Sequence, residues 1–386
     1  GKNDLLAPES FADSVSRVHK IVQPTPVKVD SENRFPRDHP GFMSFLRRPM
    51  EAHHSDFYRI CEAVNFLKDR KPADPPFMLF LATALPHCPY TVPQPWYDMY
   101  DPEDLPPLRP AELDGKPMFH RLIRRYRRLD ELDDRVLRKI MAVYLGMISY
   151  VDHLFGMVLD ALDETGLSEN TAVFMFSDHG DWAGDYGLVE KWPSGLDDCL
   201  TRIPMLVRTP ACKPGHVVDE PTACFDIMPT TLELAGIEPQ HTHYARSMTP
   251  QIRGEPGDPE RAVFADGGYD THEPHCFEGR PSDPIAGNPD GIYYPKGLQQ
   301  QQEPASVCRA TMMRTRDYKL VWRTADTNEL YNLQDDPREL TNRIDDPAYE
   351  DVKHALMTRM LDWYVHTADP VPHDGRPRGF PKDIPR

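Results

Sequence analysis

The sequence predicts an α/β fold, with a mainly parallel central sheet flanked by helices and a smaller C-terminal antiparallel α+β subdomain. Three observations lead to this fold class. The 386 residues are 39% hydrophobic, which is enough apolar material for a large core. Short, continuously apolar runs alternate with segments whose apolar residues recur every three or four positions, as buried strands and amphipathic helices do. Past about Thr249 the chain carries short strand candidates and one closing helix instead.

The first part of the chain reads as alternating helices and strands. The run FMLFLATAL follows two prolines and is short and wholly apolar, which favours a buried strand. An apolar stripe from Val136 to Leu162 predicts the longest helix, which Gly166 would end. The predicted helices are residues 55–68, 135–165 and 225–235, and the predicted strands are residues 77–85, 172–177 and 203–209.

The last part of the chain predicts a small antiparallel sheet with a covering helix. The strand candidates are residues 261–265, 310–314 and 318–323, with a long polar, Pro/Gly-rich insert between the first two. Residues 349–366 predict the closing helix. We therefore divide the chain into an α/β domain at residues 1–248 and a C-terminal subdomain at residues 249–386.

The charge and the cysteines limit the classes of partner. The formal charge of −17 repels nucleic acid and anionic membranes, so an anionic ligand would need cations supplied by its own site. The basic segment 120–129 predicts an amphipathic helix with a solvated arginine face. The seven cysteines include no C-x-x-C pair, which argues against a disulfide framework or a zinc ribbon. No apolar stretch reaches the length that spans a bilayer, and no pattern indicates an oligomeric state.

Polar side chains follow two of the predicted strands. Asp178 and His179 come directly after the strand at residues 172–177, at the sheet edge where α/β folds bind ligands. A carboxylate beside an imidazole suits a divalent cation such as Ca²⁺, Mg²⁺ or Mn²⁺. The alternative is that Asp178 caps the following turn and that His179 packs against it.

His87 follows the strand at residues 77–85, and Lys191 follows a loop punctuated by glycines. Two strands that bring polar groups to the same sheet edge indicate one functional site. Lys191 would supply the positive charge that an anion needs in order to bind to an acidic protein. Taken alone, His87 reads as a turn histidine and Lys191 as a solvated surface charge.

The stretch FMFSDHGDWAGDYGLVEK closely resembles the second signature region of sulfatases, in the alkaline phosphatase superfamily. Further stretches are similar to sulfatase segments and occur in the family's order: FMLFLATALPHCPYTVPQPWYDMYDP, TRIPMLVRTP, DIMPTTLELAGI, TMMRTRDYKLVWR and ELYNLQDDPRELTN. The resemblance covers nearly the whole chain and implies an alkaline phosphatase-like fold.

The resemblance implies a role for each candidate residue. Asp178 and His179 would ligate a divalent metal, most often Ca²⁺ in this family, with Mn²⁺ or Mg²⁺ as alternatives. Lys191 would contact the sulfate, and His87 would protonate the leaving alkoxide as a general acid. The opening residues GKND resemble the family's Gly-Lys-x-His motif, so Lys2 would steady the nucleophile, while Asp4 stands where the family usually has His.

The resemblance also implies parts that the sequence lacks. Sulfatases attack with a formylglycine made from Cys/Ser-x-Pro-x-Arg, and they bind metal through two Asp residues after the first strand. Neither feature occurs in these 386 residues. We expect both upstream of Gly1, so that residues 1–248 are a catalytic domain without its N-terminal portion and this chain alone is inactive.

The implied function is hydrolysis of a sulfate monoester of a sugar or an aryl alcohol to the alcohol and inorganic sulfate. One alternative is a phosphonate or phosphate ester hydrolase of the same superfamily. Another is a non-catalytic relative that binds metal and a glycan. His272 and His275 in the C-terminal insert would line the substrate pocket, or would be exposed loop histidines. The resemblance favours a periplasmic or secreted protein.

Overall fold

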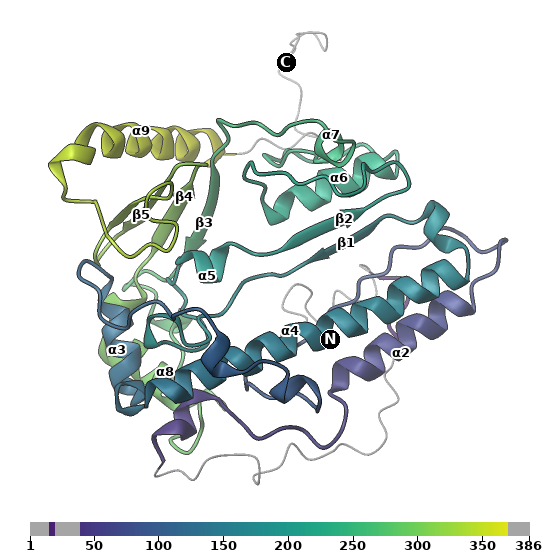
Figure 1. The fold of residues 1–386 in the computed structure, drawn as a ribbon. Helices are drawn as coiled ribbons and strands as arrows, with labels where there is room; N and C mark the ends of the chain where they lie inside the picture. Colours follow the sequence, from purple (N-terminus) through teal and green to yellow (C-terminus); the bar gives the residue numbers. More distant parts are fainter. Residues whose placement is uncertain (1–14, 20–38, 370–386) are drawn as a thin grey trace.

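The computed structural model describes residues 15–19 and 39–369. In Figure 1 the ribbon of β1 and β2 lies between the helix pair α2–α4 and the helices α6 and α7, with the sheet β3–β6 at one end. The elements in chain order are α2 (Ser55–Lys68), α3 (Met118–Tyr126), α4 (Asp134–Glu164), β1 (Val173–Phe176), α5 (Asp198–Thr201), β2 (Met205–Arg208), α6 (Ile227–Leu234), α7 (Thr249–Ile252), β3 (Val263–Gly267), α8 (Tyr294–Gln302), β4 (Ala310–Arg314), β5 (Tyr318–Arg323), β6 (Glu329–Asn332) and α9 (Glu350–Thr367).

The two long helices of the first part form within one residue of their predicted ends. α4 begins after Asp133, whose side chain accepts the Arg135 N–H at 2.9 Å, and it stops before Gly166, which adopts a φ of 70°. The buried face of α4 packs against α2 and forms much of the main core. Its members include Leu137, Ile140, Val143, Met147, Tyr150, Leu154, Val158 and Leu162.

By length and composition alone, α4 is long and apolar enough to cross a membrane, and it is the single such helix in the part of the chain that the structure describes. It is a weak candidate set against the expectation of no transmembrane segment. The core helix of a folded domain meets the same criterion because it must bury an apolar face. The contacts of α4 with α2 and the main core explain its composition in this way.

Among the described residues of the first part, parallel pairing is limited to two isolated bridges, Leu46 with Tyr90 and Met50 with Pro93. β1 pairs with β2 in antiparallel register, with Val173 opposite Arg208 and Phe176 opposite Met205. Residues 77–85 are extended but are not a strand, and residues 77–83 make no backbone hydrogen bond in the described chain. A strand requires a hydrogen-bonded neighbour, and this segment has none here.

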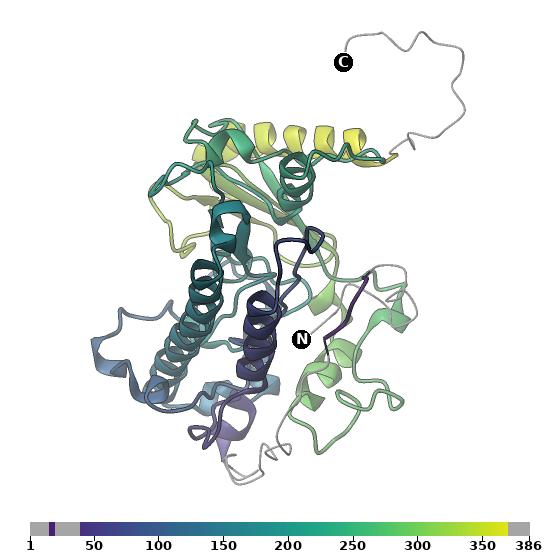
Figure 2. The ribbon, with the colours of Figure 1, turned by 90° about the vertical axis from the view of Figure 1, so that its right-hand side faces the viewer.

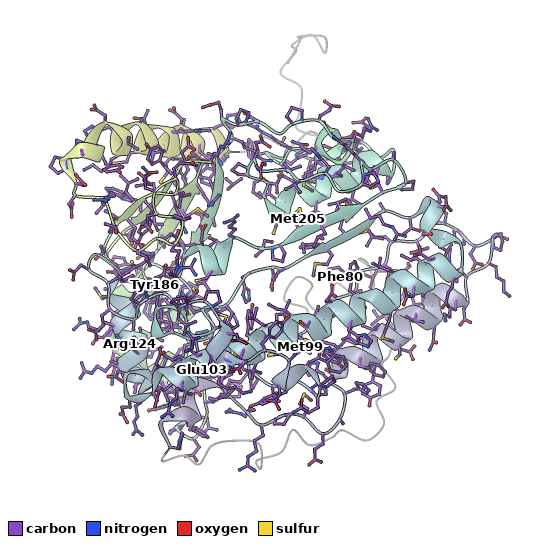
Figure 3. The ribbon with its side chains drawn as sticks, viewed as in Figure 1. Phe80, Met99, Glu103, Arg124, Tyr186 and Met205 are labelled. Atoms are coloured by element: carbon purple, nitrogen blue, oxygen red, sulfur yellow. The ribbon has the colours of Figure 1, made fainter. Side chains whose placement is uncertain are left out.

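The unpaired segment and the β1–β2 ribbon both expose apolar side chains. Met78 and Phe80 are 84% and 64% exposed, and Leu206 of β2 is 60% exposed. In the view of Figure 3, Phe80 lies between β1 and α4. The sequence predicted buried strands at these positions, but no described element covers them. Free edges with apolar side chains are sites where a further strand adds or where chains associate.

The C-terminal sheet matches its prediction more closely. The strand order is β3-β4-β5-β6 with antiparallel neighbours throughout. β4 and β5 have the predicted bounds, β3 begins two residues later, and β6 is an additional strand. Figure 2 shows α9 running across the sheet. Leu356 and Met360 of α9 are buried with Met313, Leu320 and Leu330 of the strands.

The insert between β3 and β4 folds back onto the first part of the chain. It contains α8, which was not predicted and which contacts α3. Trp192 donates its indole N–H to the Ser306 carbonyl at 2.6 Å, and Gly268 donates its backbone N–H to the Pro193 carbonyl at 2.8 Å. The insert therefore borders the segment that carries Lys191.

Candidate active site

His87 and Lys191 lie in direct contact although they are 104 positions apart in the chain. The Lys191 Nζ is 2.8 Å from the His87 Nε2. His87 sits in the turn after the extended segment, where its backbone N–H donates to the Ala84 carbonyl at 2.9 Å. The convergence predicted for these two residues is therefore present, while their chemical roles stay predictions.

The hydrogen bonds of His87 assign its tautomer. Its Nδ1 lies 2.6 Å from the Cys88 carbonyl oxygen, which can only accept, so Nδ1 carries a hydrogen. In the neutral ring the Nε2 lone pair then accepts from the Lys191 ammonium. A general acid must carry the proton that it gives, so His87 acts in this role only as an imidazolium, with a hydrogen on Nε2 as well.

A buried hydrogen-bond network joins the segments that carry the two residues. The Tyr90 hydroxyl donates to Asp181 Oδ1 at 2.6 Å, and the Glu190 backbone N–H lies 2.9 Å from the Tyr90 oxygen and 3.1 Å from Asp181 Oδ1. Burial raises the pKa of Asp181 to about 7, and burial with the nearby Asp181 raises the pKa of Tyr90. Tyr90 and Glu190 were not predicted as site residues. The sequence did offer a signal for both: they are polar residues inside the stretches that resemble sulfatase segments.

The loop between Asp178 and Lys191 depends on a close backbone approach. The Gly180 N–H donates to the Leu200 carbonyl at 2.7 Å. A Cβ at Gly180 would lie 2.0 Å from the Cys199 carbonyl oxygen, so a side chain does not fit there. This approach places the loop against the segment that leads into β2.

Asp178 and His179 are adjacent and accessible. The Asp178 side chain is 76% exposed, and its Oδ2 lies 3.8 Å from the His179 Nε2. The His179 Nδ1 is 2.7 Å from the Gly180 carbonyl, which leaves Nε2 as the lone-pair nitrogen on the side of the carboxylate. These two donors fit a divalent cation. Among the described residues no group of three or more His, Cys, Asp or Glu side chains is placed to hold a metal, so the pair is only part of a ligand set.

Glu190 sits among three cations. Its carboxylate is 3% exposed and lies 2.7 Å from Arg127, 3.2 Å from Lys296 and 3.8 Å from Lys191. Burial acts to raise the pKa of Glu190, but Lys296, Arg127 and Lys191 outweigh it and lower the pKa. The solvated arginine face predicted at residues 120–129 was wrong for Arg127, which is buried because it pairs with Glu190.

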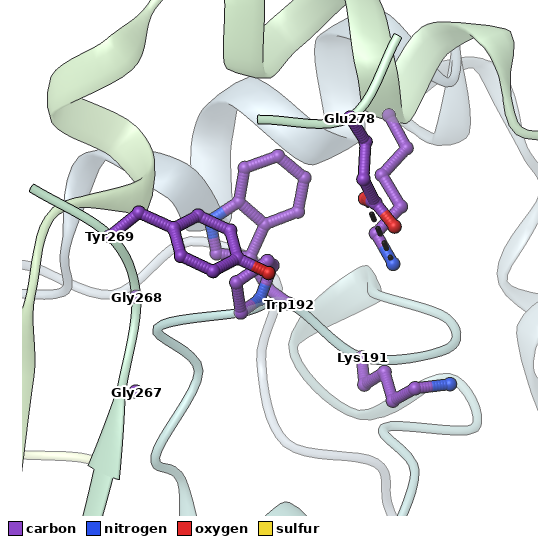
Figure 4. A pocket seen from close by; sticks show the side chains of 8 residues that line it. Lys191, Trp192, Gly267, Gly268, Tyr269 and Glu278 are labelled. Atoms are coloured by element: carbon purple, nitrogen blue, oxygen red, sulfur yellow. Dashed lines mark ion pairs between the residues drawn. The ribbon is translucent and has the colours of Figure 1, made fainter. Parts of the chain in front are cut away.

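A cavity of about 400 Å³ opens beside Lys191. It is lined by Lys191, Trp192, Pro193, Gly267, Gly268, Tyr269, Glu278 and Lys296. Figure 4 shows the Tyr269 hydroxyl pointing from one wall toward the wall that carries Glu278 and Lys191. The C-terminal insert thus lines the cavity.

The predicted pocket histidines lie elsewhere in the insert. His272 and His275 are not among the residues that line this cavity. The His272 side chain is 93% exposed and lies 2.7 Å from Asp270 Oδ1, and His275 is also exposed. Lys2, together with Asp4, falls outside the described residues, and its predicted role stays a prediction.

Family models match both parts of the chain. A model described as Sulfatase matches residues 32–237, and a model described as N-sulphoglucosamine sulphohydrolase, C-terminal, matches residues 290–365. Similar curated proteins include the multifunctional alkaline phosphatase superfamily protein PehA of Trinickia caryophylli, which is 28% identical over 84% of this chain and 62% of its own length. An arylsulfatase of Clostridium perfringens is 28% identical over 80% of this chain and 58% of its own length. An N-acetylglucosamine-6-O-sulfatase of Bacteroides thetaiotaomicron is 27% identical over 57% of this chain and 35% of its own length.

Solved structures show the same fold. A phosphonate monoester hydrolase of Silicibacter pomeroyi is 28% identical, with a TM-score of 0.59 over 75% of this chain and 55% of that chain. Another, of Agrobacterium radiobacter, is 21% identical, with a TM-score of 0.67 over 91% of this chain and 71% of that chain. These neighbours confirm the predicted fold class. The chain spans less than two thirds of the length of the three curated relatives named here.

Proposed function

The chain belongs to the sulfatase family, and from that membership we propose that the protein hydrolyses a sulfate monoester to an alcohol and inorganic sulfate. The observation that carries the proposal is the contact of Lys191 with His87 at 2.8 Å, at the rim of a cavity with two lysines. The names of two relatives, an arylsulfatase and an N-acetylglucosamine-6-O-sulfatase, support a sulfate ester of an aryl alcohol or a sugar.

The proposed mechanism assigns a task to each side chain. The Lys191 ammonium, which is 27% exposed, stabilises negative charge on the sulfuryl oxygens. As the bond between sulfur and the ester oxygen breaks, His87 in its imidazolium form donates the Nε2 proton to the departing oxygen and becomes the neutral Nδ1–H ring. The neutral ring then accepts a hydrogen bond from the Lys191 ammonium, which keeps its charge. The buried Asp181–Tyr90 contact holds both residues in position.

Two groups in this proposal are not among the described side chains. A formylglycine would supply the nucleophile, as its hydrate, and no Cys/Ser-x-Pro-x-Arg motif occurs in the 386 residues. A divalent metal, which we propose to be Ca²⁺, would neutralise charge on sulfate and would be held in part by Asp178 and His179. The accessible, adjacent donor atoms of these two residues support that assignment.

The first test compares Lys191→Ala with Lys139→Ala in protein that hydrolyses 4-nitrophenyl sulfate. The two lysine side chains are 27% and 28% exposed, so they are matched in accessibility. We expect Lys191→Ala to lower kcat/KM for 4-nitrophenyl sulfate by about 10²–10³-fold, as loss of a charge-stabilising donor does. Lys139→Ala should retain wild-type activity, and circular dichroism should be unchanged in both. Near-wild-type turnover in Lys191→Ala would refute the assignment.

The second test addresses the general acid. His87→Asn should slow an alkyl sulfate far more than 4-nitrophenyl sulfate, because an alkoxide needs a proton in order to leave and a nitrophenolate does not. Equal losses on both substrates would exclude His87 as the acid and would leave it a structural partner of Lys191.

A phosphonate ester hydrolase is the second candidate, favoured by the 28% identity to the Silicibacter pomeroyi enzyme. The same cations would stabilise either oxyanion, so charge alone does not separate the two reactions. Parallel kcat/KM values for 4-nitrophenyl sulfate and 4-nitrophenyl phenylphosphonate decide between them. Binding of both esters without turnover would favour the non-catalytic alternative instead.

A further inference from the structure

We propose that the cavity beside Lys191 recognises the alcohol part of the ester as a hydroxylated sugar ring, with Glu278 and Tyr269 as the specificity-determining residues. The inference rests on the proposed function, because it takes Lys191 as the residue that binds the sulfuryl group. It goes further in choosing a sugar over a plain aromatic alcohol, and in naming the side chains that make the choice.

The two lysines of the cavity differ in how far nearby carboxylates neutralise them. This difference predicts which way round the ester binds. The Lys296 side chain is 8% exposed and is held between Glu190 at 3.2 Å and Glu278 at 3.5 Å, so carboxylates of the protein already neutralise it. Lys191 is 27% exposed and lies farther from Glu190, at 3.8 Å. The anionic end of a ligand therefore belongs at Lys191, and its uncharged part extends toward Glu278 and Tyr269 (Figure 4).

Glu278 offers an unused hydrogen-bond acceptor to that part of the ligand. Its Oε2 receives the Gln300 side-chain N–H at 2.6 Å and faces Lys296. Its Oε1 has no hydrogen-bond partner among the described residues, and the side chain is 39% exposed where it lines the cavity. A carboxylate oxygen accepts only, so it favours a ligand that donates, such as a hydroxyl or an ammonium group, and it disfavours a second anion.

Tyr269 provides a second polar group and an apolar face. Its backbone N–H donates to the Val307 carbonyl at 2.8 Å, which fixes the residue, while its hydroxyl has no partner within the described chain. In Figure 4 the aromatic ring lies on the wall opposite Glu278, with its hydroxyl end directed across the cavity. Sugar rings match such a wall, because their C–H faces pack on aromatic surface while their hydroxyls reach polar groups at the rim.

The size of the cavity and the cost of unpaired polar groups favour one sugar over an aryl ring. A volume of about 400 Å³ is near the lower end of the range for small-molecule sites, which suits a single ring with its sulfuryl group. An aryl ring brings no donor for Glu278 Oε1 and none for the Tyr269 hydroxyl. A site built to hydrogen-bond a substrate rejects analogues that lack the donor, because its own groups are left unpaired.

The experiment compares hexose monosulfates with cyclohexylmethyl sulfate, which keeps a six-membered ring but has no hydroxyl. The panel contains the 2-, 3- and 6-sulfates of glucose, galactose and glucosamine. We expect the best hexose sulfate to exceed cyclohexylmethyl sulfate by at least about 100-fold in kcat/KM. Glu278→Gln should lower that ratio about tenfold, chiefly through KM, and Tyr269→Phe should lower it several-fold.

Glu273→Gln is the matched control. Glu273 lies in the same insert and pairs with Arg309 at 2.7 Å, but it does not line the cavity. This variant should keep the wild-type ratio. The inference is overturned if no hexose sulfate is preferred over cyclohexylmethyl sulfate, or if Glu278→Gln and Glu273→Gln behave alike.

A binding measurement separates failure of this inference from failure of the proposed function. If no sulfate ester is hydrolysed, the proposed function fails, and calorimetric titration with the same panel still tests the cavity. Tighter binding of a hexose sulfate than of cyclohexylmethyl sulfate, weakened about tenfold by Glu278→Gln, supports sugar recognition. Equal binding of the two kinds of ester, or equal binding by the two Glu variants, refutes it.

Discussion

Replacing Glu190 by Gln removes the negative charge that three buried or half-buried cations share. In the native protein Glu190 is 3% exposed and contacts Arg127 at 2.7 Å, with Arg127 itself only 2% exposed. The amide leaves Arg127 buried without a counter-ion, and breaking a buried pair in this way costs about 3–5 kcal/mol. With an unfolding entropy of about 2.1 cal/mol/K per residue over 386 residues, the expected fall in Tm is about 4–6 °C.

The pH dependence of the same variant gives a second readout. The pKa of Glu190 is lowered in the folded protein from its ordinary value of 4.5, so its stabilising contribution is complete above that value. The contribution is lost as the pH falls through the lowered folded pKa. The stability difference between wild type and Glu190→Gln should therefore be constant from pH 6 to 8 and should shrink below pH 4.5.

Calorimetry and urea unfolding across pH 3.5–8 measure both effects. The control is Glu131→Gln, which breaks an exposed pair with Arg128. The Arg128 and Glu131 side chains are 47% and 46% exposed, so this variant should be about as stable as wild type. A Glu190→Gln variant as stable as the control at pH 7, or a stability gap that widens in acid, would refute the reasoning.

Two further predictions concern the loop and the exposed edge. Gly180→Ala should lower the free energy of unfolding in urea by about 1–3 kcal/mol, because the new Cβ would meet the Cys199 carbonyl. A Cβ at Gly156 would have no atom within 4 Å, so Gly156→Ala should stabilise α4 by about 0.5–1 kcal/mol. Equal effects would show that the loop adapts freely. In light scattering, the 386-residue chain carrying Met78→Lys and Phe80→Lys should self-associate less than wild type. These side chains are 84% and 64% exposed, on a segment whose backbone makes no hydrogen bond within the part of the chain that the structure describes. The control Met99→Lys, at a position 48% exposed, should not change the association, and a matching decrease would attribute the effect to charge alone.

The elements with a strong periodic pattern were predictable because that pattern is local. α2 and α4 lie within one residue of their predicted ends, and β4 and β5 match theirs. Each is specified by its own apolar spacing and stop signals, such as Gly166. α8 had no such pattern: its sequence is YPKGLQQQQ, and it forms where the insert packs against α3.

The residues at the ends of predicted strands were also predictable, since polar groups after an apolar run stand out in one dimension. His87, Asp178 and His179 were selected in this way, and Lys191 was selected because it follows a loop punctuated by glycines. Their partners were not, because Arg127 and Lys296 read as surface charges until Glu190, 63 and 106 positions away, pairs with them. Burial of a charge depends on its counter-ion, which local sequence does not reveal.

The amino-acid order determined which segments can become helices or strands and which side chains carry chemistry, because propensity, periodicity and acid–base character belong to the residues themselves. The tertiary structure decided which of those groups meet. It set the contact of Lys191 with His87 and brought Glu278 and Tyr269, rather than His272 and His275, to the cavity. It also left residues 77–83 without a backbone hydrogen bond to any residue in the described ranges. Distances between positions far apart in the chain are properties of packing, and a linear pattern contains no measure of them.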